Sequence, residues 1–234
     1  MEVTLIDHMG SDLSVVNAAR VSFHKESEWS FTERAVTSKD QQENPFPEYP
    51  IEQILTPTLS DKDIKLINYL AKHKHHSPFN HTFITVRVKA PIFVARQLVK
   101  HKFMPWNEVS RRYVDDEPEF YFPEVWRGKA ENAKQGSNGT VDMTGVTIRE
   151  HAEHALDWYE WMLERGVAPE QARMMLPQNT MTEWHWSGTL GAFGDMLKLR
   201  LDAHAQQESR EVAEKIRDKL LPLFPVSLKA LLEN

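Results

Sequence analysis

The segment HTFITVRVK, near the middle of the chain, constrains the fold more than any other stretch. Ile84, Val86 and Val88 alternate with more polar neighbours, so a strand there would bury one face and expose the other. After Pro91, apolar residues recur at helical spacing until Pro105 interrupts them. The sequence therefore predicts a half-buried strand that leads directly into a helix.

Two further segments alternate as strands do, and most of the remaining apolar residues follow helical spacing. Trp184 and Trp186 share one face of the second such strand, and we expect them to fill the core. Thr147 and Glu150 are spaced as a capping box at the start of a helix. Strands are expected over residues 2–6 and 180–187, and helices over residues 11–23, 60–73, 147–165, 169–176, 189–204 and 208–221.

Two stretches interrupt this pattern. Residues 25–60 are polar and contain four prolines, so we expect a long surface insertion with at most one short helix. Residues 127–145 are poor in large apolar side chains and rich in Gly, Asn and Lys, which predicts a mobile loop. Because 234 residues suffice for one sizeable core, we expect a single domain over residues 1–234.

The composition limits the chemistry that is available to the chain. It has no cysteine, which excludes disulfides, thiolate metal sites and a cysteine nucleophile. Its formal net charge is -6, so any anion must be bound by a local basic cluster. The N-terminus lacks the basic and apolar regions of a signal peptide, and no apolar run approaches the ~20 residues that span a bilayer. We therefore expect a cytoplasmic protein with no membrane partner.

The segment ARQLVKHKFMPWNEVSRRY contains such a basic cluster. One interpretation is a solvated basic face. The other is a ligand site, because residues 107–113, if extended, would place Glu108, Ser110 and Arg112 on one side. A carboxylate, a hydroxyl and a guanidinium together suit a phosphorylated heterocycle. Gln97, on the preceding helix, can point toward the same pocket. The basic side chains are Arg96, Lys100, His101, Lys102, Arg111 and Arg112.

The segment HKHHSPFNH contains four histidines and raises the question of a metal site, since imidazole is a common metal ligand. Capping of a helix end by a histidine is the simpler structural interpretation. The chain has no HExxH helix and no cysteine, so the usual signatures of a zinc site are missing, and we expect no metal. Glycine-rich phosphate loops are also absent, so a nucleotide must be held in another way. The histidines are His73, His75, His76 and His81.

The segment RQLVKHKFMPWNEVSRRY resembles the signature of the flavin-dependent thymidylate synthases, in which RHR is followed after seven residues by serine, usually within NExSxRY. The chain has Lys100 and Lys102 where the family has arginines, Pro105 where serine is usual, and Asp195 where the family often has Asn or His. Three other parts resemble the same family: DLSVVNAARVSF, HHSPFNHTFITVRVKAPIFVARQ, and EQARMMLP together with LKLRLDAHAQ. The resemblance covers most of the chain outside residues 25–60 and 127–145.

The resemblance implies an α+β fold with a central, mainly antiparallel sheet flanked by helices, and a homotetramer. The implied reaction converts dUMP to dTMP, with methylenetetrahydrofolate as carbon donor, FAD as hydride carrier and NADPH as reductant. The absence of cysteine agrees with this, because the other class of thymidylate synthase attacks the uracil ring with a cysteine thiolate. The implied partners are dUMP and folate, with no nucleic acid.

The resemblance also implies roles for individual residues. The positions that match dUMP contacts are Gln97, Glu108, Ser110, Arg112, Arg173 and Arg200. The positions that match FAD contacts are Ser22, Ser77, Lys100, His101, Lys102, Glu108 and Asp195. His75 matches a histidine near the flavin ring and folate, and the catalytic set would be Arg200, Ser110 and His75. Arg112 and Arg173 would face the phosphate, whereas Arg200 would stabilise negative charge that develops on the pyrimidine.

Two other functions stay open on the sequence alone. A metal-dependent nucleotide hydrolase would use the histidines of residues 73–81, and bound flavin would argue against it. A non-catalytic nucleic-acid binder would use the basic residues between 96 and 112. The negative net charge and the interruption by Glu108 argue against the second alternative.

Overall fold

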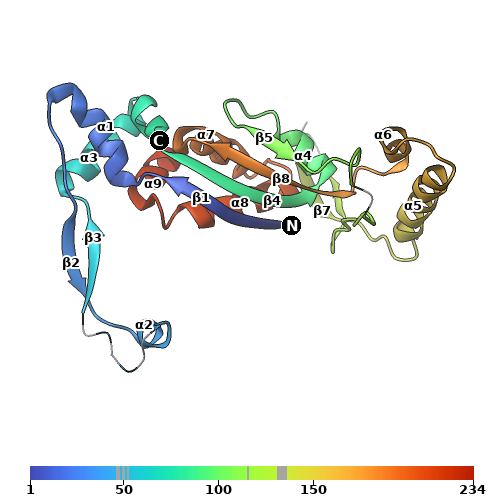
Figure 1. The fold of residues 1–234 in the computed structure, drawn as a ribbon, viewed down its shortest axis with the longest axis horizontal. Helices are drawn as coiled ribbons and strands as arrows, with labels where there is room; N and C mark the ends of the chain where they lie inside the picture. Colours follow the sequence, from blue (N-terminus) through green and yellow to red (C-terminus); the bar gives the residue numbers. More distant parts are fainter. Residues whose placement is uncertain (46–47, 49–50, 52, 115, 131–135) are drawn as a thin grey trace.

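The centre of the fold is a four-stranded sheet in the order β1, β4, β8, β5, in which every neighbouring pair is antiparallel. The computed structural model describes residues 1–45, 48, 51, 53–114, 116–130 and 136–234. Helices lie against one face of the sheet, and an arm projects from one end of the elongated body (Figure 1). The predicted α+β fold with a mainly antiparallel sheet is confirmed. The strands span Glu2–Met9 (β1), Phe83–Pro91 (β4), Trp106–Glu108 (β5) and Met181–Gly188 (β8).

The pairing of β4 with β8 builds the buried face of this sheet. Val86 lies opposite Trp186 and Val88 opposite Trp184, and all four residues are at most 1% exposed. Trp106 of β5 stacks on Trp184 with ring centroids 4.3 Å apart. Cross-strand pairs of aromatic and β-branched side chains stabilise a sheet. Both predicted strands and the core role of the two tryptophans are confirmed.

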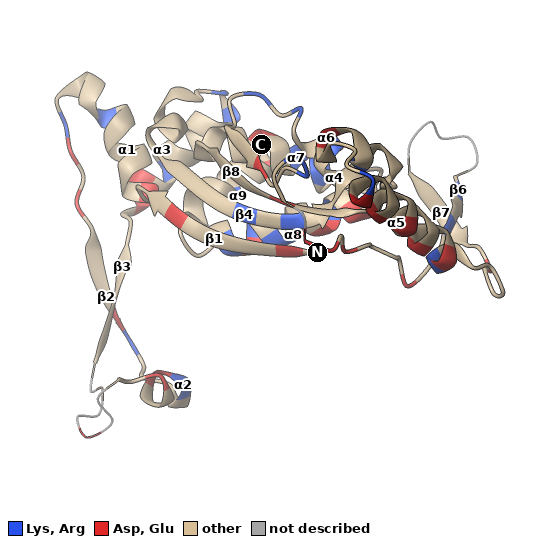
Figure 2. Ribbon diagram, turned by 45° about the vertical axis from the view of Figure 1, so that its right-hand side comes forward, with Lys and Arg blue, Asp and Glu red and all other residues tan. Residues whose placement is uncertain are grey.

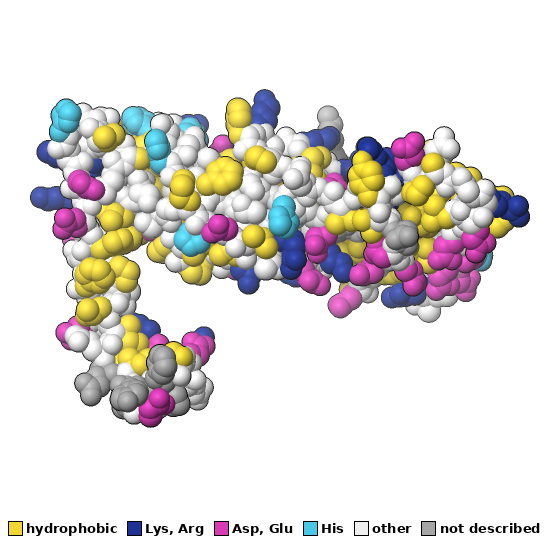
Figure 3. Space-filling model, viewed as in Figure 1, with side chains coloured by type: hydrophobic (Ala, Val, Ile, Leu, Met, Phe, Trp, Pro, Cys, Tyr) yellow, Lys and Arg dark blue, Asp and Glu magenta, His cyan; other side chains and the backbone are white. Residues whose placement is uncertain are grey.

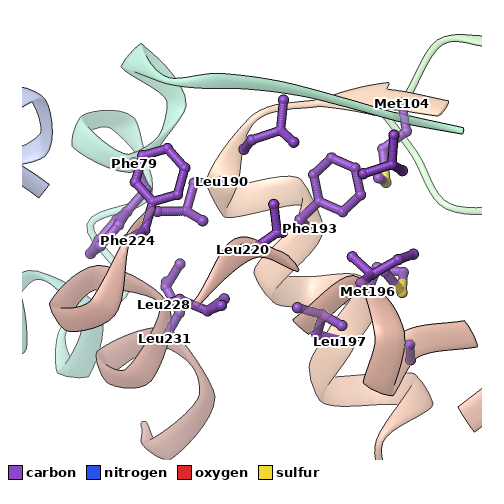
Figure 4. Close-up of a cluster of buried hydrophobic side chains, with 14 of the residues drawn as sticks. Phe79, Met104, Leu190, Phe193, Met196, Leu197, Leu220, Phe224, Leu228 and Leu231 are labelled. Carbon is purple, nitrogen blue, oxygen red and sulfur yellow. The ribbon is translucent and has the colours of Figure 1, made fainter. Parts of the chain in front are cut away.

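Helices cover the apolar face of the sheet. Side chains of α7, α8 and α9 pack there with Phe79 and Met104, as Figure 4 shows. Ser60 caps α3, whereas Thr147 makes no side-chain capping bond to any described residue, so the predicted capping box is wrong. The helices are α1 Asp12–Arg20, α3 Asp61–Lys72, α4 Ile92–Leu98, α5 Ile148–Glu164, α6 Pro169–Ala172, α7 Leu190–Arg200, α8 Gln207–Leu220 and α9 Pro225–Glu233.

The helix after β4 is shorter than predicted. α4 ends at Leu98 instead of continuing to Pro105. Phe103 is 88% exposed and has a φ of 60°, which is incompatible with a right-handed helix. The residues between α4 and β5 therefore form turns that carry Lys100 and Lys102 at the surface and leave His101 half-buried.

The last helix, α9, is missing from the sequence prediction. Asp12 of α1 holds its N-terminus, because the carboxylate accepts hydrogen bonds from the backbone N–H groups of Val226 and Ser227, each at 2.8 Å. The first N–H groups of a helix lack partners within the helix, and an anion there also complements the helix dipole. Asp12 is only 2% exposed, so a buried carboxylate joins the first and last helices of the chain.

The described residues between 25 and 60 form an arm that contains regular structure. Strand β2, Ser30–Arg34, pairs antiparallel with β3, Ile54–Thr58, and the short helix α2, Ser38–Gln42, lies between them. One short helix is present as expected, but the expectation that the stretch would contain no other regular structure is wrong, because of the paired strands. Pro57 did not prevent the pairing, because a strand of a two-stranded sheet has a free edge on which a missing N–H costs nothing.

Asp63 holds both ends of the arm at the body. Its carboxylate accepts hydrogen bonds from Ser27 at 2.8 Å and from Ser60 at 2.6 Å, and it forms an ion pair with Arg20 of α1 at 2.6 Å. Asp63 is 2% exposed. Burial alone would raise the pKa of Asp63, but the hydrogen bonds from Ser60, Arg20 and Ser27 hold it below its usual value. The base of the arm is thus fixed by a buried carboxylate.

Residues 127–145 also contain regular structure. Strand β6, Arg127–Lys129, pairs antiparallel with β7, Ser137–Thr140, so the prediction of a loop is wrong for these strands. Residues 131–135, at the centre of the predicted loop, lie outside the described residues.

Charged and histidine side chains are distributed unevenly over the molecule. Figure 2 shows acidic residues, coloured red on the ribbon, along α5, and Figure 3 shows several histidine side chains at the end of the body that carries α1 and α3. In the part of the chain that the structure describes, no helix is both long enough and apolar enough to cross a membrane.

Replacing Asp63 by asparagine should destabilise the protein and loosen the arm. The change removes the anion that faces Arg20, and breaking a buried ion pair on one side costs about 3 kcal/mol. We expect that decrease in the free energy of unfolding by urea denaturation, with faster proteolytic cleavage between residues 28 and 59. The pKa of Asp63 is lower in the folded state than in the unfolded state. Its contribution to the free energy of unfolding is therefore present above the pKa of the unfolded state and is lost as the pH falls through the pKa of the folded state.

The matched control is Asp61→Asn, because Asp61 is exposed in the first turn of the same helix. Asp61→Asn should lower the free energy of unfolding by less than about 1 kcal/mol. Equal unfolding midpoints for the parent and Asp63→Asn would contradict the assignment of Asp63 as the anchor of the arm.

Candidate functional site

Arg200, the last residue of α7, is held by two acceptors. Its Nε donates to Nε2 of His101 at 3.0 Å, and its Nη2 donates to the backbone oxygen of Gln97 at 2.8 Å. Gln97 lies near the end of α4, and His101 lies in the turn that follows. The structure therefore brings three of the predicted site residues together from two helices and a turn.

The electrostatics of this contact are set by its partial burial. Burial lowers the pKa of Arg200, although a guanidinium remains charged. Burial, and then the neighbouring Arg200 cation, lower the pKa of His101 to about 4, while Asp195 acts in the opposite direction. The His101 ring is therefore neutral at neutral pH, and its unprotonated nitrogen can accept the hydrogen bond from Arg200.

A cavity of about 490 Å³ opens beside Arg200. Its described lining contains two arginines and no carboxylate. Glu208 balances the charge of Arg127, so it is Arg200 that favours an anion or a ring on which negative charge develops. The lining residues are Gln97, Arg127, Gly136, Ser137, Arg200, His204, Ala205 and Gln206.

A chain of hydrogen bonds supports the wall of this cavity. Arg127 pairs with Glu208 at 2.5 Å, and Gln206 donates to the other oxygen of Glu208 at 3.0 Å. The side chain of Gln97 bonds to that of Gln206 and accepts from Ser209 at 3.1 Å. Burial alone would raise the pKa of Glu208, but the hydrogen bonds from Arg127 and Gln206 hold it below its usual value. Gln97 is thus fixed through both its side chain and its backbone.

Sequence reasoning missed Arg127, Gln206 and Glu208. Arg127 begins β6, in a stretch that was predicted to be a loop. For Gln206, a signal was present, because the segment LKLRLDAHAQ resembles a C-terminal part of the family and ends at this residue. No signal in the sequence joined Arg127 to Glu208, since their pairing depends on the β6–β7 hairpin lying against α8.

Glu108 and Arg173 lie at a second, smaller pocket of about 130 Å³. The Glu108 carboxylate accepts hydrogen bonds from Trp106 at 2.9 Å and from Thr182 at 2.8 Å, so the sheet sets its orientation. Arg173, at the start of the 3-10 helix Arg173–Met175, is exposed and donates from Nε to the backbone oxygen of Glu170 at 3.2 Å. The pocket combines an oriented carboxylate with a guanidinium, which suits a ligand with both a donor edge and an anionic group.

The prediction that Glu108, Ser110 and Arg112 share one side of an extended segment is wrong. β5 ends at Glu108, and the N–H of Tyr113 bonds back to the oxygen of Ser110 at 2.9 Å, which closes a turn. The guanidinium of Arg112 lies 4.9 Å from the centre of the Tyr113 ring. Among the described lining residues of the two cavities, neither Ser110 nor Arg112 occurs.

Ser22, Ser77 and His75 lie at the other end of the body. Ser22 belongs to the 3-10 helix Val21–Phe23, which follows α1, and Ser77 begins the 3-10 helix Ser77–His81, against which α1 packs. Figure 1 shows α1 and α3 at one end of the sheet and α4 and α6 at the other. One copy of the chain therefore does not bring all the predicted site residues together.

Lys100 and Lys102 are exposed in the turns after α4 and form no ion pair with a described residue. Cations without a carboxylate partner suit phosphate groups such as those of FAD. Asp195, exposed on α7, lies close enough to act electrostatically on His101. The two lysines therefore fit the phosphates of FAD in charge, whereas Ser22 and Ser77 are at the opposite end of the same copy.

The histidines of residues 73–81 do not converge on one point. The ring of His73 lies 4.3 Å from that of Tyr69 and 6.3 Å from that of His75, measured between centroids. Within the described ranges, no three His, Cys, Asp or Glu side chains come together in a way that could hold a metal ion. The histidine cluster of the sequence is therefore a set of neighbouring surface side chains.

Comparison with known proteins identifies close sequence relatives. The family model described as thymidylate synthase complementing protein matches residues 4–226. The chain is 36% identical over 234 residues to a flavin-dependent thymidylate synthase of Thermus thermophilus. The aligned region covers 99% of this chain and 76% of the relative. It is 34% identical over 235 residues to a flavin-dependent thymidylate synthase of Kosmotoga olearia, with 98% and 89% of the two chains covered.

The fold is also similar to solved structures. The UMP/dUMP methylase PolB from Streptomyces cacaoi, bound with 5-Br dUMP, matches with a TM-score of 0.76 and 29% identity over 98% of this chain and 93% of that one. The same enzyme with 5-Br UMP matches with a TM-score of 0.75 and 28% identity over 98% and 92%. From the family match and these identities, the chain belongs to the flavin-dependent thymidylate synthase family, and this membership implies FAD as a cofactor.

Proposed function

We propose that the protein catalyses the reductive methylation of dUMP to dTMP, with methylenetetrahydrofolate as carbon donor, FAD as hydride carrier and NADPH as reductant. The observation that carries the proposal is Arg200 held by His101 and Gln97 at the wall of the 490 Å³ cavity. All three residues stand at positions where the chain resembles the family. Membership of the family and the likeness to a UMP/dUMP methylase support the same class of substrate.

In this proposal, the residues of the chain bind and orient the pyrimidine. Arg200 stabilises negative charge that develops on the ring, because the guanidinium is fixed before the reaction begins. Glu108, oriented by Trp106 and Thr182, accepts a hydrogen bond from the nucleotide. The chain has no cysteine that could attack the ring, so its contribution is orientation and electrostatics. FAD, when bound, supplies the hydride.

We assign the phosphate of dUMP to Arg173 and Arg112, with Ser110 beside them. Lys100 and Lys102 are proposed to bind FAD. The remaining proposed FAD contacts are Ser22, Ser77, His101, Glu108 and Asp195, with His75 near the flavin ring and folate. Because Ser22, Ser77 and His75 lie at the opposite end of the body from Arg200, we propose that several copies build each site in a homotetramer.

UMP is a second candidate substrate. The likeness to PolB favours it, because that enzyme is described as a UMP/dUMP methylase and was solved with bromo derivatives of both nucleotides. The two nucleotides differ in the ribose 2′-hydroxyl, which is a hydrogen-bond donor and acceptor. Assays should therefore offer both nucleotides.

Product analysis tests the proposed function. Protein supplied with FAD, NADPH, methylenetetrahydrofolate and either nucleotide should form the 5-methylated product, and omission of any component should prevent it. Hydrolysis of the nucleotide instead would favour the metal-dependent hydrolase. A salt-sensitive gel shift without turnover would favour the nucleic-acid binder. We also propose a cytoplasmic location and a single domain over residues 1–234, without a membrane partner.

Arg200→Ala and Arg173→Ala should each abolish turnover and leave the protein folded. Loss of a hydrogen bond to a charged group should weaken dUMP binding by about 1.5 to 3 kcal/mol in each variant. Isothermal titration with dUMP measures this, and circular dichroism checks the fold. Arg217→Ala is the control, because the Arg217 side chain forms a solvent-exposed ion pair with Asp218, and this variant should bind dUMP as the parent does. Parent-like titrations of the Arg200 and Arg173 variants would refute their assignment.

Two inactive variants should complement each other if the site is built from several copies. Ser110→Ala and His75→Ala are expected to be inactive separately, whereas their mixture, unfolded and refolded together, should regain part of the parent activity. The reason is that mixed tetramers contain some sites with both native residues. Light scattering should give four copies of the chain. An active monomer would disprove the shared site.

The lysines that replace the arginines of the family should give weak, salt-sensitive FAD binding. An ammonium is a point charge on a flexible stem, whereas a guanidinium bonds in a fixed planar fork. Lys100→Ala should weaken FAD binding roughly 2- to 5-fold, and Lys100→Arg with Lys102→Arg should tighten it. Flavin fluorescence quenching at low and high salt measures both, with the exposed Lys229→Ala as control. If Lys100→Ala binds FAD as tightly as the parent, Lys100 belongs to a solvated face.

A further inference from the structure

We propose that His101 is a positioning residue, which accepts a hydrogen bond from Arg200 and thereby fixes the edge that this guanidinium presents to the cavity. Only the kinetic test of this role rests on the proposed function.

The geometry divides the guanidinium of Arg200 into two edges. Nε and Nη2 lie on one edge, and that edge is occupied by Nε2 of His101 at 3.0 Å and by the backbone oxygen of Gln97 at 2.8 Å. The other edge carries the remaining terminal N–H groups, which have no acceptor among the described residues, and Arg200 lines the 490 Å³ cavity. Since the fork is planar, fixing one edge fixes the direction of the other.

The acceptor role requires a particular form of the His101 ring. An imidazole nitrogen accepts a hydrogen bond only when it carries no proton, so Nε2 must be bare and the proton must sit on Nδ1. The charged groups that face the ring are Arg200 and Asp195, both from α7, and β8 contributes the uncharged ring of Trp186 at 6.1 Å between centroids. Burial and the Arg200 cation together lower the pKa of His101 to about 4, which keeps the ring neutral.

Gln97, the second acceptor of Arg200, is itself held in place by hydrogen bonds. Its side chain is held by Gln206 and Ser209, so the backbone oxygen that faces Arg200 is fixed in turn. A protonated His101 would place a second cation against Arg200 and could not accept its Nε–H. With His101 neutral, the two acceptors act as a pair that orients Arg200 without neutralising it. The positive charge therefore remains available to the cavity.

The role predicts a double-mutant cycle. His101→Phe keeps a ring of similar size but removes the acceptor, and it should lower kcat/KM roughly 10- to 100-fold, with most of the loss in kcat. His101→Gln retains an acceptor and should recover much of this loss. In an Arg200→Lys background, where a single ammonium on a flexible stem replaces the planar fork, His101 has no edge to orient, and His101→Phe should lower kcat/KM less than about 3-fold. Rates are compared per bound flavin, so that any loss of FAD is separated from the effect on Arg200.

The exposed His154 of α5 supplies the matched control, and His154→Phe should have parent activity. Equal effects of His101→Phe in the parent and in the Arg200→Lys background would overturn the proposal, because a residue that acts only through packing or FAD does not depend on Arg200.

Nuclear magnetic resonance of the holoprotein gives a readout that needs no turnover. With ¹⁵N-labelled histidine, and the His101→Gln spectrum for assignment, the ring should be the neutral Nδ1–H tautomer from pH 6 to 8. Arg200→Lys should shift its Nε2 resonance. An Nε2–H tautomer, or protonation of the ring near pH 6.5, would overturn the proposal. If the parent methylates neither nucleotide, the proposed function fails, while this spectrum still decides the role of His101.

Discussion

The antiparallel pairing of β4 with β8 is the interaction on which the rest of the structure depends. It buries Val86 against Trp186 and Val88 against Trp184, and it also decides where the two following helices begin. α4 starts at the end of β4, beside Met181, whereas α7 starts at the opposite end of β8 and returns across the sheet. Eleven helical residues advance about 16 Å. The end of α7 therefore reaches the end of α4, and Arg200 meets Gln97 and His101.

Buried carboxylates connect parts of the chain that are far apart in sequence. Asp12 holds the start of α9, Asp63 joins α1 to both ends of the arm, and Glu208 joins the β6–β7 hairpin to α8 through Arg127. Each is at most 4% exposed and accepts more than one hydrogen bond. A buried charge is tolerated only when it is paired and hydrogen-bonded, so each of these contacts fixes one arrangement of the segments it joins.

The sequence predicts elements whose signal is local. Alternation identified β4 and β8, because each buries only one face, and the core role of Trp184 and Trp186 followed from the same period. Helical spacing misled the prediction after Leu98, since it cannot show that Phe103 has a positive φ. The paired strands of the arm were not predicted, because their residues are mostly exposed and polar and show no clear alternation of apolar and polar side chains.

The sequence predicted several residues of the candidate site, but it did not predict how these residues are arranged in space. The resemblance supplied Gln97, His101 and Arg200, which the structure brings together, but it could not supply Arg127 and Glu208, whose pairing depends on tertiary packing. Ser110 and Arg112 do not share one side of an extended segment with Glu108, because a turn follows β5. Ser22, Ser77 and His75 lie far from Arg200 within one copy, because α1 and the 3-10 helix Ser77–His81 pack together at the other end of the body.

The central claim is that Arg200, oriented by His101 and Gln97, contacts the pyrimidine ring of a uridine nucleotide. A crystal structure of the protein with FAD and dUMP tests it most directly. The account predicts the uracil ring in the cavity beside Arg200, with a ring oxygen about 3 Å from the guanidinium edge that faces away from His101. A uracil ring bound elsewhere, or an Arg200 side chain that has left His101 and Gln97 to reach the nucleotide, would contradict it.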